Sequence, residues 1–366
     1  MKQIIKQFGL VLSCFCGFSA VSSNIYAQDT AVEKAKLILF PALTRSVETS
    51  WAAGGAASLT FRGRASDSLS RTSGLQAAVL YSLRHQLIAT MRGTQYLQGE
   101  RYIFNELFSF SSFPDKFWGM GKDTKDNAFE DYQFRQFYVF LHPMHRVARH
   151  LFVGLRYEYQ RVWNIQYQAG GLFDQQNVAG RKGYHVSGPG ISLTYDTRNH
   201  AFSPDKGFFA QVYLSRFGSF SGSDYDYTNY ALDLRHFMKA GDQGVIALQA
   251  WVFANRGDVP LRSLAAFGGG SSMRGYYEGR FRDLNQYVIQ GEYRRPVYKR
   301  FGLVAFASFG NVASRLGALD LTNLKYSFGG GMRYALNKSE KLNLRIDYGI
   351  GRGHNSGLYF QLGEAF

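Results

Sequence analysis

Residues 151–161, Leu-Phe-Val-Gly-Leu-Arg-Tyr-Glu-Tyr-Gln-Arg, decide the fold of this chain. Large apolar side chains such as Leu151 and Val153 occupy every second position, and Arg156 and Glu158 fall in the positions between. A period of two is typical of a β-strand, because successive side chains point to opposite faces. A soluble sandwich would bury the apolar face in a core. Charges of both signs on the other face instead indicate a wet interior opposite a lipid-facing exterior.

The same alternation recurs along the chain, for example in 342–350 and in 229–235. It predicts sixteen strands, and sealing the first to the last would remove the open edges that lipid does not tolerate. We therefore expect an all-β chain that forms a single 16-stranded antiparallel transmembrane β-barrel. The predicted strands lie near 36–45, 50–62, 74–84, 86–97, 100–110, 131–142, 149–162, 184–197, 207–216, 226–239, 243–255, 286–297, 301–312, 325–337, 341–352 and 357–366.

The lengths of the connections predict the orientation. Most connections after even-numbered strands are short, whereas those after odd-numbered strands include the long ones: 111–130, 163–183, 256–285 and 313–324. Outer-membrane barrels have short periplasmic turns and long external loops. The parity therefore predicts a barrel in the outer membrane of a Gram-negative bacterium, with both termini in the periplasm.

The beginning of the chain has the features of a secretory signal peptide, which we assign to residues 1–27. Lys2 and Lys6 give a positively charged beginning, and the apolar stretch 8–21 follows. Ala27 supplies the small residue that signal peptidase needs. Processing as a lipoprotein at Cys14 is the alternative, although the apolar stretch would then be short.

After this signal we expect a short periplasmic lead at 28–35 and the barrel at 36–366. Both cysteines, Cys14 and Cys16, lie within the predicted signal, so disulfides would not stabilise the exported chain. The exported part has no run of about 18 apolar residues, which excludes a transmembrane helix there. The full chain has an aromatic content of 16% and 40 glycines, which suit aromatic girdles and tight turns.

The formal net charge is +15, or 15 − 2 = +13 without Lys2 and Lys6. Positive charge can face anionic lipid or nucleic acid. The alternative is that arginines and lysines fill a wet lumen and solvated loops, and we favour it because many arginines fall on inward strand positions. We therefore expect contact with outer-membrane lipid and lipopolysaccharide, and no nucleic-acid partner.

The most informative motif is 268–281, Gly-Gly-Gly-Ser-Ser-Met-Arg-Gly-Tyr-Tyr-Glu-Gly-Arg-Phe, in the longest predicted loop. Three further stretches lie within 190–207, 301–312 and 344–349. Together, and in their order along the chain, these four segments resemble the BamA/TamA-like outer-membrane assembly-factor family (the bacterial surface antigen family). The resemblance covers the second half of the chain strongly and the first half weakly.

In that family the loop folds back into the lumen, and its arginine pairs with acidic groups on the inner wall. The resemblance places this arginine at Arg274, followed by Gly275 and Tyr276. Alternation along the predicted strands independently places Glu292 and Asp347 on the inner face. The resemblance thus implies that these residues register the loop within the lumen. The alternative is that Arg274 is an ordinary solvated loop residue.

The chain departs from the family at two points. Ser308 stands where the family commonly has an acidic residue, which leaves Glu292 and Asp347 as the candidate partners of the loop arginine. Family members usually carry periplasmic POTRA domains ahead of the barrel, and the predicted lead is too short for one. This departure puts direct delivery of client chains in doubt, and a periplasmic partner protein could supply the missing domains.

The last predicted strand, 357–366, ends in an aromatic residue and resembles the terminal signal that outer-membrane assembly machinery recognises. Phe360, Leu362 and Phe366 would carry this signal. Its physical basis is an unpaired strand that can be captured by strand addition. An ordinary closing strand is the alternative, and a barrel needs one in either case.

These features favour a barrel that inserts or transports outer-membrane proteins, with client outer-membrane proteins as further partners. The alternative is a passive pore or ligand-binding barrel without insertase activity. We expect no enzyme and no cofactor, because there is no Gly-x-Ser-x-Gly elbow and no phosphate loop. We also expect no metal site, since His142 and His145 are placed at a strand end without metal-ligand spacing. Residues 117–121 are expected to form an external aromatic loop that packs on itself.

Overall fold

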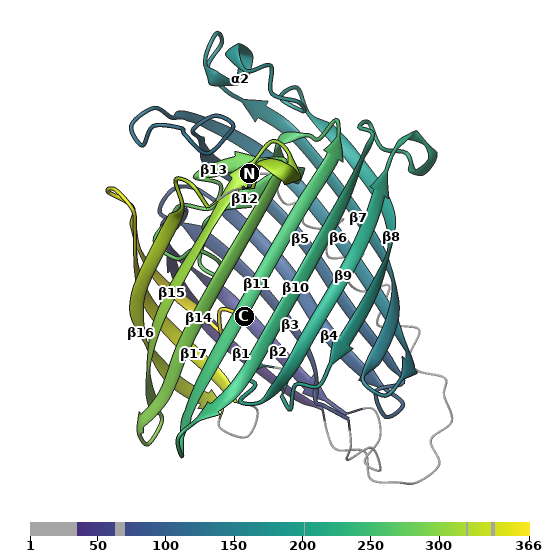
Figure 1. Cartoon of the computed structure of the whole chain (residues 1–366), viewed down its shortest axis with the longest axis vertical. Helices are drawn as coiled ribbons and strands as arrows, with labels where there is room; N and C mark the ends of the chain where they lie inside the picture. Colours follow the sequence, from purple (N-terminus) through teal and green to yellow (C-terminus); the bar gives the residue numbers. More distant parts are fainter. Residues whose placement is uncertain (1–34, 63–69, 201, 320, 338–340) are drawn as a thin grey trace.

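The computed structural model describes residues 35–62, 70–200, 202–319, 321–337 and 341–366. The predicted signal peptide and nearly all of the predicted lead lie outside the described residues. Sixteen strands close an antiparallel barrel in the described part of the chain, as the alternation predicts (Figure 1). No helix in these ranges is long and apolar enough to cross a bilayer.

Each barrel strand pairs with its neighbours in sequence, except that β11 pairs with β14 across the long connection 258–284 and that β18 pairs with β1. The strands are β1 (Lys36–Ser46), β2 (Ser50–Phe61), β3 (Ser73–Ser82), β4 (Leu87–Leu97), β5 (Tyr102–Phe117), β6 (Glu130–Ala148), β7 (Leu151–Gln166), β8 (Tyr184–Asp196), β9 (Gly207–Phe217), β10 (Tyr227–Ala240), β11 (Gly244–Gly257), β14 (Asn285–Tyr298), β15 (Phe301–Ala313), β16 (Lys325–Asn337), β17 (Leu342–Gly351) and β18 (Ser356–Leu362).

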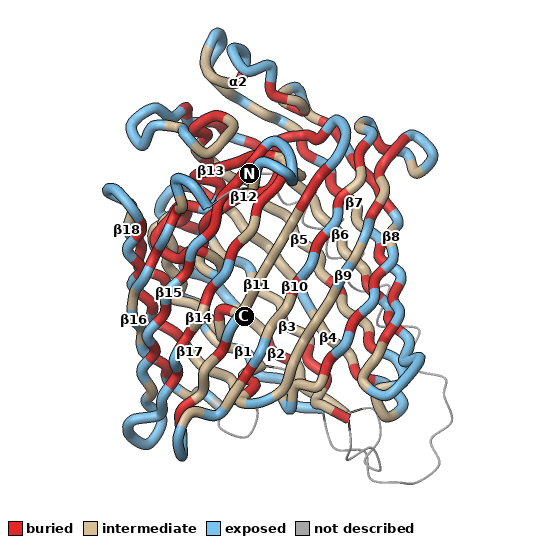
Figure 2. Tube along the Cα trace, viewed as in Figure 1, coloured by how far each residue is buried: buried red, intermediate tan, exposed pale blue. Residues whose placement is uncertain are grey.

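Exposure along the strands is inverted relative to a soluble protein. Leu155 is 65% exposed, whereas its neighbour Arg156 is only 8% exposed. Likewise Tyr348 is 49% exposed and Asp347 is fully covered. Buried and exposed residues alternate along β7 and β17 (Figure 2). The alternation thus places apolar side chains on the outer face and charged ones on the inner face, as expected for a wall between lipid and a polar lumen.

Three predicted strand ends were wrong. β5 runs to Phe117, well past the predicted end at 110, and β6 runs to Ala148 instead of 142. The last part of β5 rises beyond the lipid-facing band, where side chains meet loops and the hydropathy alternation fades. β18 stops at Leu362 instead of residue 366, because Gly363 adopts a φ of +88° that turns the chain away from the sheet.

The connections distinguish two rims. The loop rim carries the long connections 118–129, 167–183, 218–226, 258–284 and 314–324, and the turn rim carries short ones such as 241–243 (Figure 1). We call residues 258–284 the cap loop. It contains a 3-10 turn, η2 (Leu261–Ser263), and a hairpin of β12 (Ala265–Phe267) and β13 (Phe281–Asp283), which the sequence did not predict. The other short helical turns are α2 (Leu172–Gln175), η1 (Ser219–Ser221) and η3 (Leu316–Ala318).

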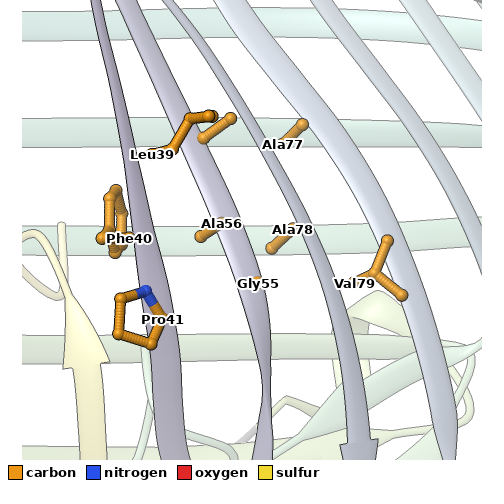
Figure 3. A pocket seen from close by; sticks show the side chains of 9 residues that line it. Leu39, Phe40, Pro41, Gly55, Ala56, Ala77, Ala78 and Val79 are labelled. Carbon is orange, nitrogen blue, oxygen red and sulfur yellow. The ribbon is translucent and has the colours of Figure 1, made fainter.

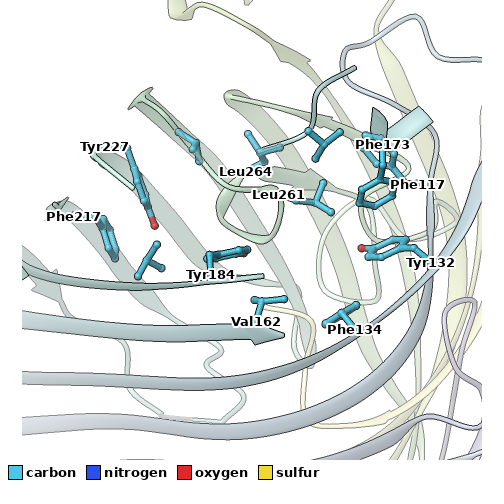
Figure 4. Packing of buried hydrophobic residues seen from close by; sticks show 13 residues of the cluster. Phe117, Tyr132, Phe134, Val162, Phe173, Tyr184, Phe217, Tyr227, Leu261 and Leu264 are labelled. Carbon is cyan, nitrogen blue, oxygen red and sulfur yellow. The ribbon is translucent and has the colours of Figure 1, made fainter. Parts of the chain in front are cut away.

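The largest cluster of buried apolar side chains lies at the loop rim (Figure 4). Leu261 and Leu264 of the cap loop pack there against side chains of β5 to β10 and of α2. The cluster consists of Phe117, Tyr132, Phe134, Val162, Phe173, Val178, Tyr184, Val186, Phe217, Tyr227, Val259, Leu261 and Leu264. The largest apolar core of this barrel therefore lies between the cap loop and the inner wall at the loop rim.

Candidate functional site

Arg274 of the cap loop lies against the inner wall, between two carboxylates. Its Nη1 donates to Oδ2 of Asp347 on β17 at 2.6 Å, and its Nη2 donates to Oε1 of Glu292 on β14. The guanidinium also stacks 3.6 Å from the ring centre of Phe306. Arg274 is 1% exposed and both carboxylate side chains are fully covered. We call these three charged residues the loop lock.

Further arginines on the wall share the two carboxylates. Arg294 donates to Glu292 at 2.6 Å, and Arg333 donates to Asp347 at 2.5 Å. Arg345 is 3.3 Å from Asp347. Burying a charge is costly unless it is paired and hydrogen-bonded, and each buried carboxylate here has at least two guanidinium partners.

Glycines allow the loop backbone to approach β17 closely. Gly275 has a φ of +111°, and a Cβ added to it would lie 2.8 Å from the backbone nitrogen of Gly351. A Cβ on Gly349 would lie 2.6 Å from the carbonyl of Arg274. The Gly275 N–H donates to the Tyr359 hydroxyl at 3.0 Å. The loop backbone at Arg274 and Gly275 can therefore lie this close to β17 only because Gly275 on the loop and Gly349 on the strand have no Cβ.

Tyr276 fixes the next step of the loop. Its hydroxyl donates to the Tyr326 carbonyl at 3.0 Å and accepts from the Arg352 N–H at 2.8 Å. Ser308 shares a hydrogen bond of 2.7 Å with Ser327 instead of meeting the loop arginine. The structure thus brings together Arg274, Gly275, Tyr276, Glu292 and Asp347, whereas Ser308 stays apart.

The three residues of the predicted terminal signal separate in space. Tyr359 contacts the cap loop from the inner face of β18, so its alternating neighbours Phe360 and Leu362 lie on the outer face. Phe366 lies beyond the turn at Gly363, within reach of Arg294, whose guanidinium is 5.4 Å from its ring centre. The prediction that Phe366 ends the last strand was therefore wrong.

The segment after Gly363 enters the lumen, and sequence reasoning missed its anchor. The Glu364 carboxylate accepts hydrogen bonds from Arg333 at 2.8 Å and from Asn343 at 2.7 Å, and its side chain is 3% exposed. The end of the chain consequently lies about midway between the rims (Figure 1). A glycine followed by an acidic residue at the end of an apolar strand was the available signal for this turn.

The seam between β1 and β18 is the weakest junction of the barrel wall. Its register contains one pair, Arg45↔Phe360, whereas every other pair of neighbours in the ring has at least seven. One side-chain bond, from Thr44 to the Phe360 carbonyl at 2.6 Å, supports it. On this register Leu362 reaches Leu43, so residues 36–42 of β1, including Pro41, extend past the end of β18.

The wall beside the seam is built from small side chains (Figure 3). Ala56 and Ala57 of β2 pair with Ala78 and Ala77 of β3, and Gly55 pairs with Val79. An apolar hollow follows these positions and is bordered by Leu39, Phe40, Pro41 and Val79. Few side-chain contacts therefore stiffen the strands next to the junction that is least paired.

The structure also joins residues that the sequence left apart. His142 lies inside β6, not at its end, and its Nε2 is 2.7 Å from the Ser192 hydroxyl, with the Asn105 amide 3.5 Å from Nδ1. Gly154 leaves the room for this contact across β7. His142 and Ser192 are 1% and 5% exposed, so we interpret them as a packed polar contact of the wall. Among the described residues no group of three metal-binding side chains occurs.

The predicted aromatic loop packs mainly on other segments. Phe117 ends β5 and lies 4.8 Å from the ring of Phe173. Trp118 contacts Phe129 of its own connection at 5.6 Å and Tyr277 of the cap loop at 5.1 Å. This connection is therefore part of the cap.

A closed barrel whose lumen holds an arginine-anchored loop, beside a scarcely paired seam, defines a class of outer-membrane barrels related to assembly and translocation factors. Within that class the chain belongs to the Omp85 superfamily, whose domain matches residues 94–366. The predicted resemblance to BamA/TamA-like factors is confirmed, and with it an outer-membrane location. Barrels of this superfamily are assembly or transport factors rather than enzymes.

Solved structures of this class share the fold. A BamA from Haemophilus ducreyi lacking POTRA domains 1–3 has a TM-score of 0.56 at 12% identity, over 90% of this chain and 70% of that chain. CdiB from Acinetobacter baumannii gives 0.57 at 11%, over 91% and 66%, and CdiB from Escherichia coli gives 0.58 at 11%, over 93% and 63%. This chain thus spans about two thirds of each CdiB structure. No curated protein matches the chain.

Proposed function

We propose that this barrel inserts or transports outer-membrane proteins by lending the free edge of β1 to an incoming strand. The observation that carries the proposal is the seam, where one register pair joins β1 to β18. An unpaired edge recruits a partner strand through main-chain hydrogen bonds. The inward turn at Gly363 keeps β18 away from residues 36–42, so this edge is available without breaking a long ladder.

Further parts of the proposal follow from the family and from the sequence. Client outer-membrane proteins would be the substrates, a periplasmic partner would deliver them, and lipid and lipopolysaccharide would surround the wall. The signal of residues 1–27 would direct export, with the lead and the turn rim in the periplasm and the cap loop outside. The last residues would start from the periplasmic rim, where β18 ends, and turn back into the lumen. The outward Phe360 and Leu362 of β18, with Phe366, would be read by assembly machinery when this barrel itself is inserted. We propose no catalytic role and no cofactor.

A disulfide across the seam tests the proposal. The paired positions Arg45 and Phe360 lie directly opposite each other, close enough for a double cysteine variant to bridge after oxidation. We expect the oxidised Arg45→Cys/Phe360→Cys barrel to lose assisted insertion of a client barrel into liposomes, and reduction to restore it. The matched control is Val153→Cys/Leu193→Cys, a pair on β7 and β8 far from the seam.

The same experiment separates the alternative of a passive pore. A pore would keep a steady conductance in planar bilayers whether or not the seam is bridged, and it would not assist insertion in either state. Equal insertion by the oxidised seam variant and by the oxidised control would refute the proposed use of the β1 edge.

A further inference from the structure

A second group of contacts holds the cap loop on the far side of the lumen. They converge on Asp115, near the end of β5, whose side chain is 3% exposed. From the cap loop, the Tyr277 hydroxyl donates to its Oδ1 at 2.8 Å and Arg262 Nη1 donates to its Oδ2 at 3.1 Å. Arg282 Nη2 lies 3.7 Å away. From the wall, the Tyr132 hydroxyl donates to Oδ2 at 2.8 Å.

The wall residues of this group are remote from the wall residues of the loop lock. Around the ring, β5 is seven strand steps from β14 through β6 to β11, and 16 − 7 = 9 steps the other way. The two strands therefore lie almost opposite each other. Arg274 holds one side of the cap loop on β14 and β17, and Asp115 holds the other side on β5.

Neighbouring contacts join the cap loop to the connection 118–129 beside Asp115. The connection 118–129 bonds the cap loop directly, since Gly121 N–H donates to the Arg282 carbonyl at 2.7 Å and Arg280 pairs with Asp126 at 2.6 Å. Phe117, at the end of β5, and Leu261, next to Arg262, belong to the apolar cluster of the loop rim (Figure 4). Burial and the adjacent carboxylate of Asp115 raise the pKa of Tyr277, so its hydroxyl stays a hydrogen-bond donor at neutral pH.

We infer that Asp115 is a second, independent anchor of the cap loop and that it closes the lumen at the loop rim on the β5 to β10 side. Within the part of the chain that the structure describes, this carboxylate is the one acidic partner that Arg262 and Arg282 share, and both guanidinium groups come from the loop. A buried charge left without its partner is strongly unfavourable, so the loop segment should leave the wall when the carboxylate is removed. Opening on this side leaves the Arg274 contacts in place.

Two cysteine reporters distinguish the anchors, in a full chain whose Cys14 and Cys16 are replaced by serine. Leu264→Cys lies in the cluster beside Asp115, and Met273→Cys lies beside the loop lock; both native side chains are buried. We expect Asp115→Ala to speed maleimide labelling of Leu264→Cys at least tenfold and to change that of Met273→Cys less than twofold. Arg274→Ala should do the reverse.

The control is Asp233→Ala, because Asp233 is also a lumen carboxylate but bonds Arg235 and Gln249 of the wall itself. If Asp115→Ala does not fold, Tyr277→Phe removes one bond from the loop side and should still speed labelling of Leu264→Cys severalfold. Labelling at the rate of the Asp233→Ala control in Asp115→Ala, or in Tyr277→Phe where it replaces that variant, would overturn the inference. So would an equal response of both reporters, which would mean a single anchor.

Discussion

Removal of Asp347 should destabilise the barrel more than removal of Arg274, although the two side chains bond each other. The two side chains belong to a cluster of charged side chains on the inner wall. This charged cluster comprises four guanidinium groups, of Arg274, Arg294, Arg333 and Arg345, and three carboxylates, of Glu292, Asp347 and Glu364. Its net charge is 4 − 3 = +1. Arg274→Ala changes this to 3 − 3 = 0, whereas Asp347→Ala changes it to 4 − 2 = +2.

These charges set the magnitudes. After Arg274→Ala, Glu292 keeps Arg294 and Asp347 keeps Arg333, so the loss is two charge-assisted hydrogen bonds offset by one guanidinium that is no longer buried, about 1–3 kcal/mol. After Asp347→Ala, buried guanidinium groups lose a shared carboxylate, which costs about 3–5 kcal/mol. A difference of about 2 kcal/mol corresponds to roughly thirtyfold in the unfolding equilibrium.

Equilibrium urea unfolding in lipid vesicles, followed by tryptophan fluorescence, measures both losses. Arg235→Ala is the matched control, because Arg235 pairs with Asp233 at 2.6 Å on β10 and is more exposed; we expect a loss of about 1 kcal/mol or less. A cost of Arg274→Ala equal to or above that of Asp347→Ala would refute the assignment of the remaining arginines as partners of the two carboxylates.

Three other changes test separate parts of the site. Gly349→Ala places a Cβ 2.6 Å from the Arg274 carbonyl, so we expect it to release the cap loop and raise labelling of Met273→Cys as much as Arg274→Ala does. Burial, and then the Glu278 carboxylate, raise the pKa of Glu48 from 4.5 to about 7 in the turn between β1 and β2, so the folded state binds the proton more tightly than the unfolded chain. The free energy of unfolding of the barrel should therefore fall by up to about 3 kcal/mol as pH rises from 4.5 to 7. In Glu48→Gln, the urea midpoint should no longer decrease with pH over this range. Glu364→Gln weakens the contacts to Arg333 and Arg294, and trypsin or carboxypeptidase should then reach the terminal segment faster than in Asp233→Asn.

The barrel could be predicted because lipid and water impose their pattern on every strand separately. Period-two alternation in 151–161 needs no knowledge of any distant residue, and the same holds for the inward positions of Glu292 and Asp347. The turn at Gly363 could not be predicted in this way, because it depends on Glu364 meeting Arg333 and Asn343 on other strands. The β12–β13 hairpin was missed because three-residue strands carry no periodic signal.

Asp115 was missed for a related reason. Beyond the lipid-facing band, β5 no longer alternates between apolar and polar residues, so residues 111–117 were predicted as part of a loop. Its partners Tyr277 and Arg262 are more than 140 positions away in sequence. Contacts that close a cap over a barrel are set by tertiary packing, which a single sequence reveals only where a family motif marks it, as at Arg274.

Pro41 limits how firmly the free edge of β1 could hold an incoming strand. Proline is accommodated in sheets where its missing N–H faces an open side, and Pro41 lies where β18 has already ended. A client strand paired along β1 would find no N–H donor at Pro41, with a short run of main-chain hydrogen bonds on either side. The two runs can break one after the other instead of all at once. This favours release of an inserted client strand over its retention.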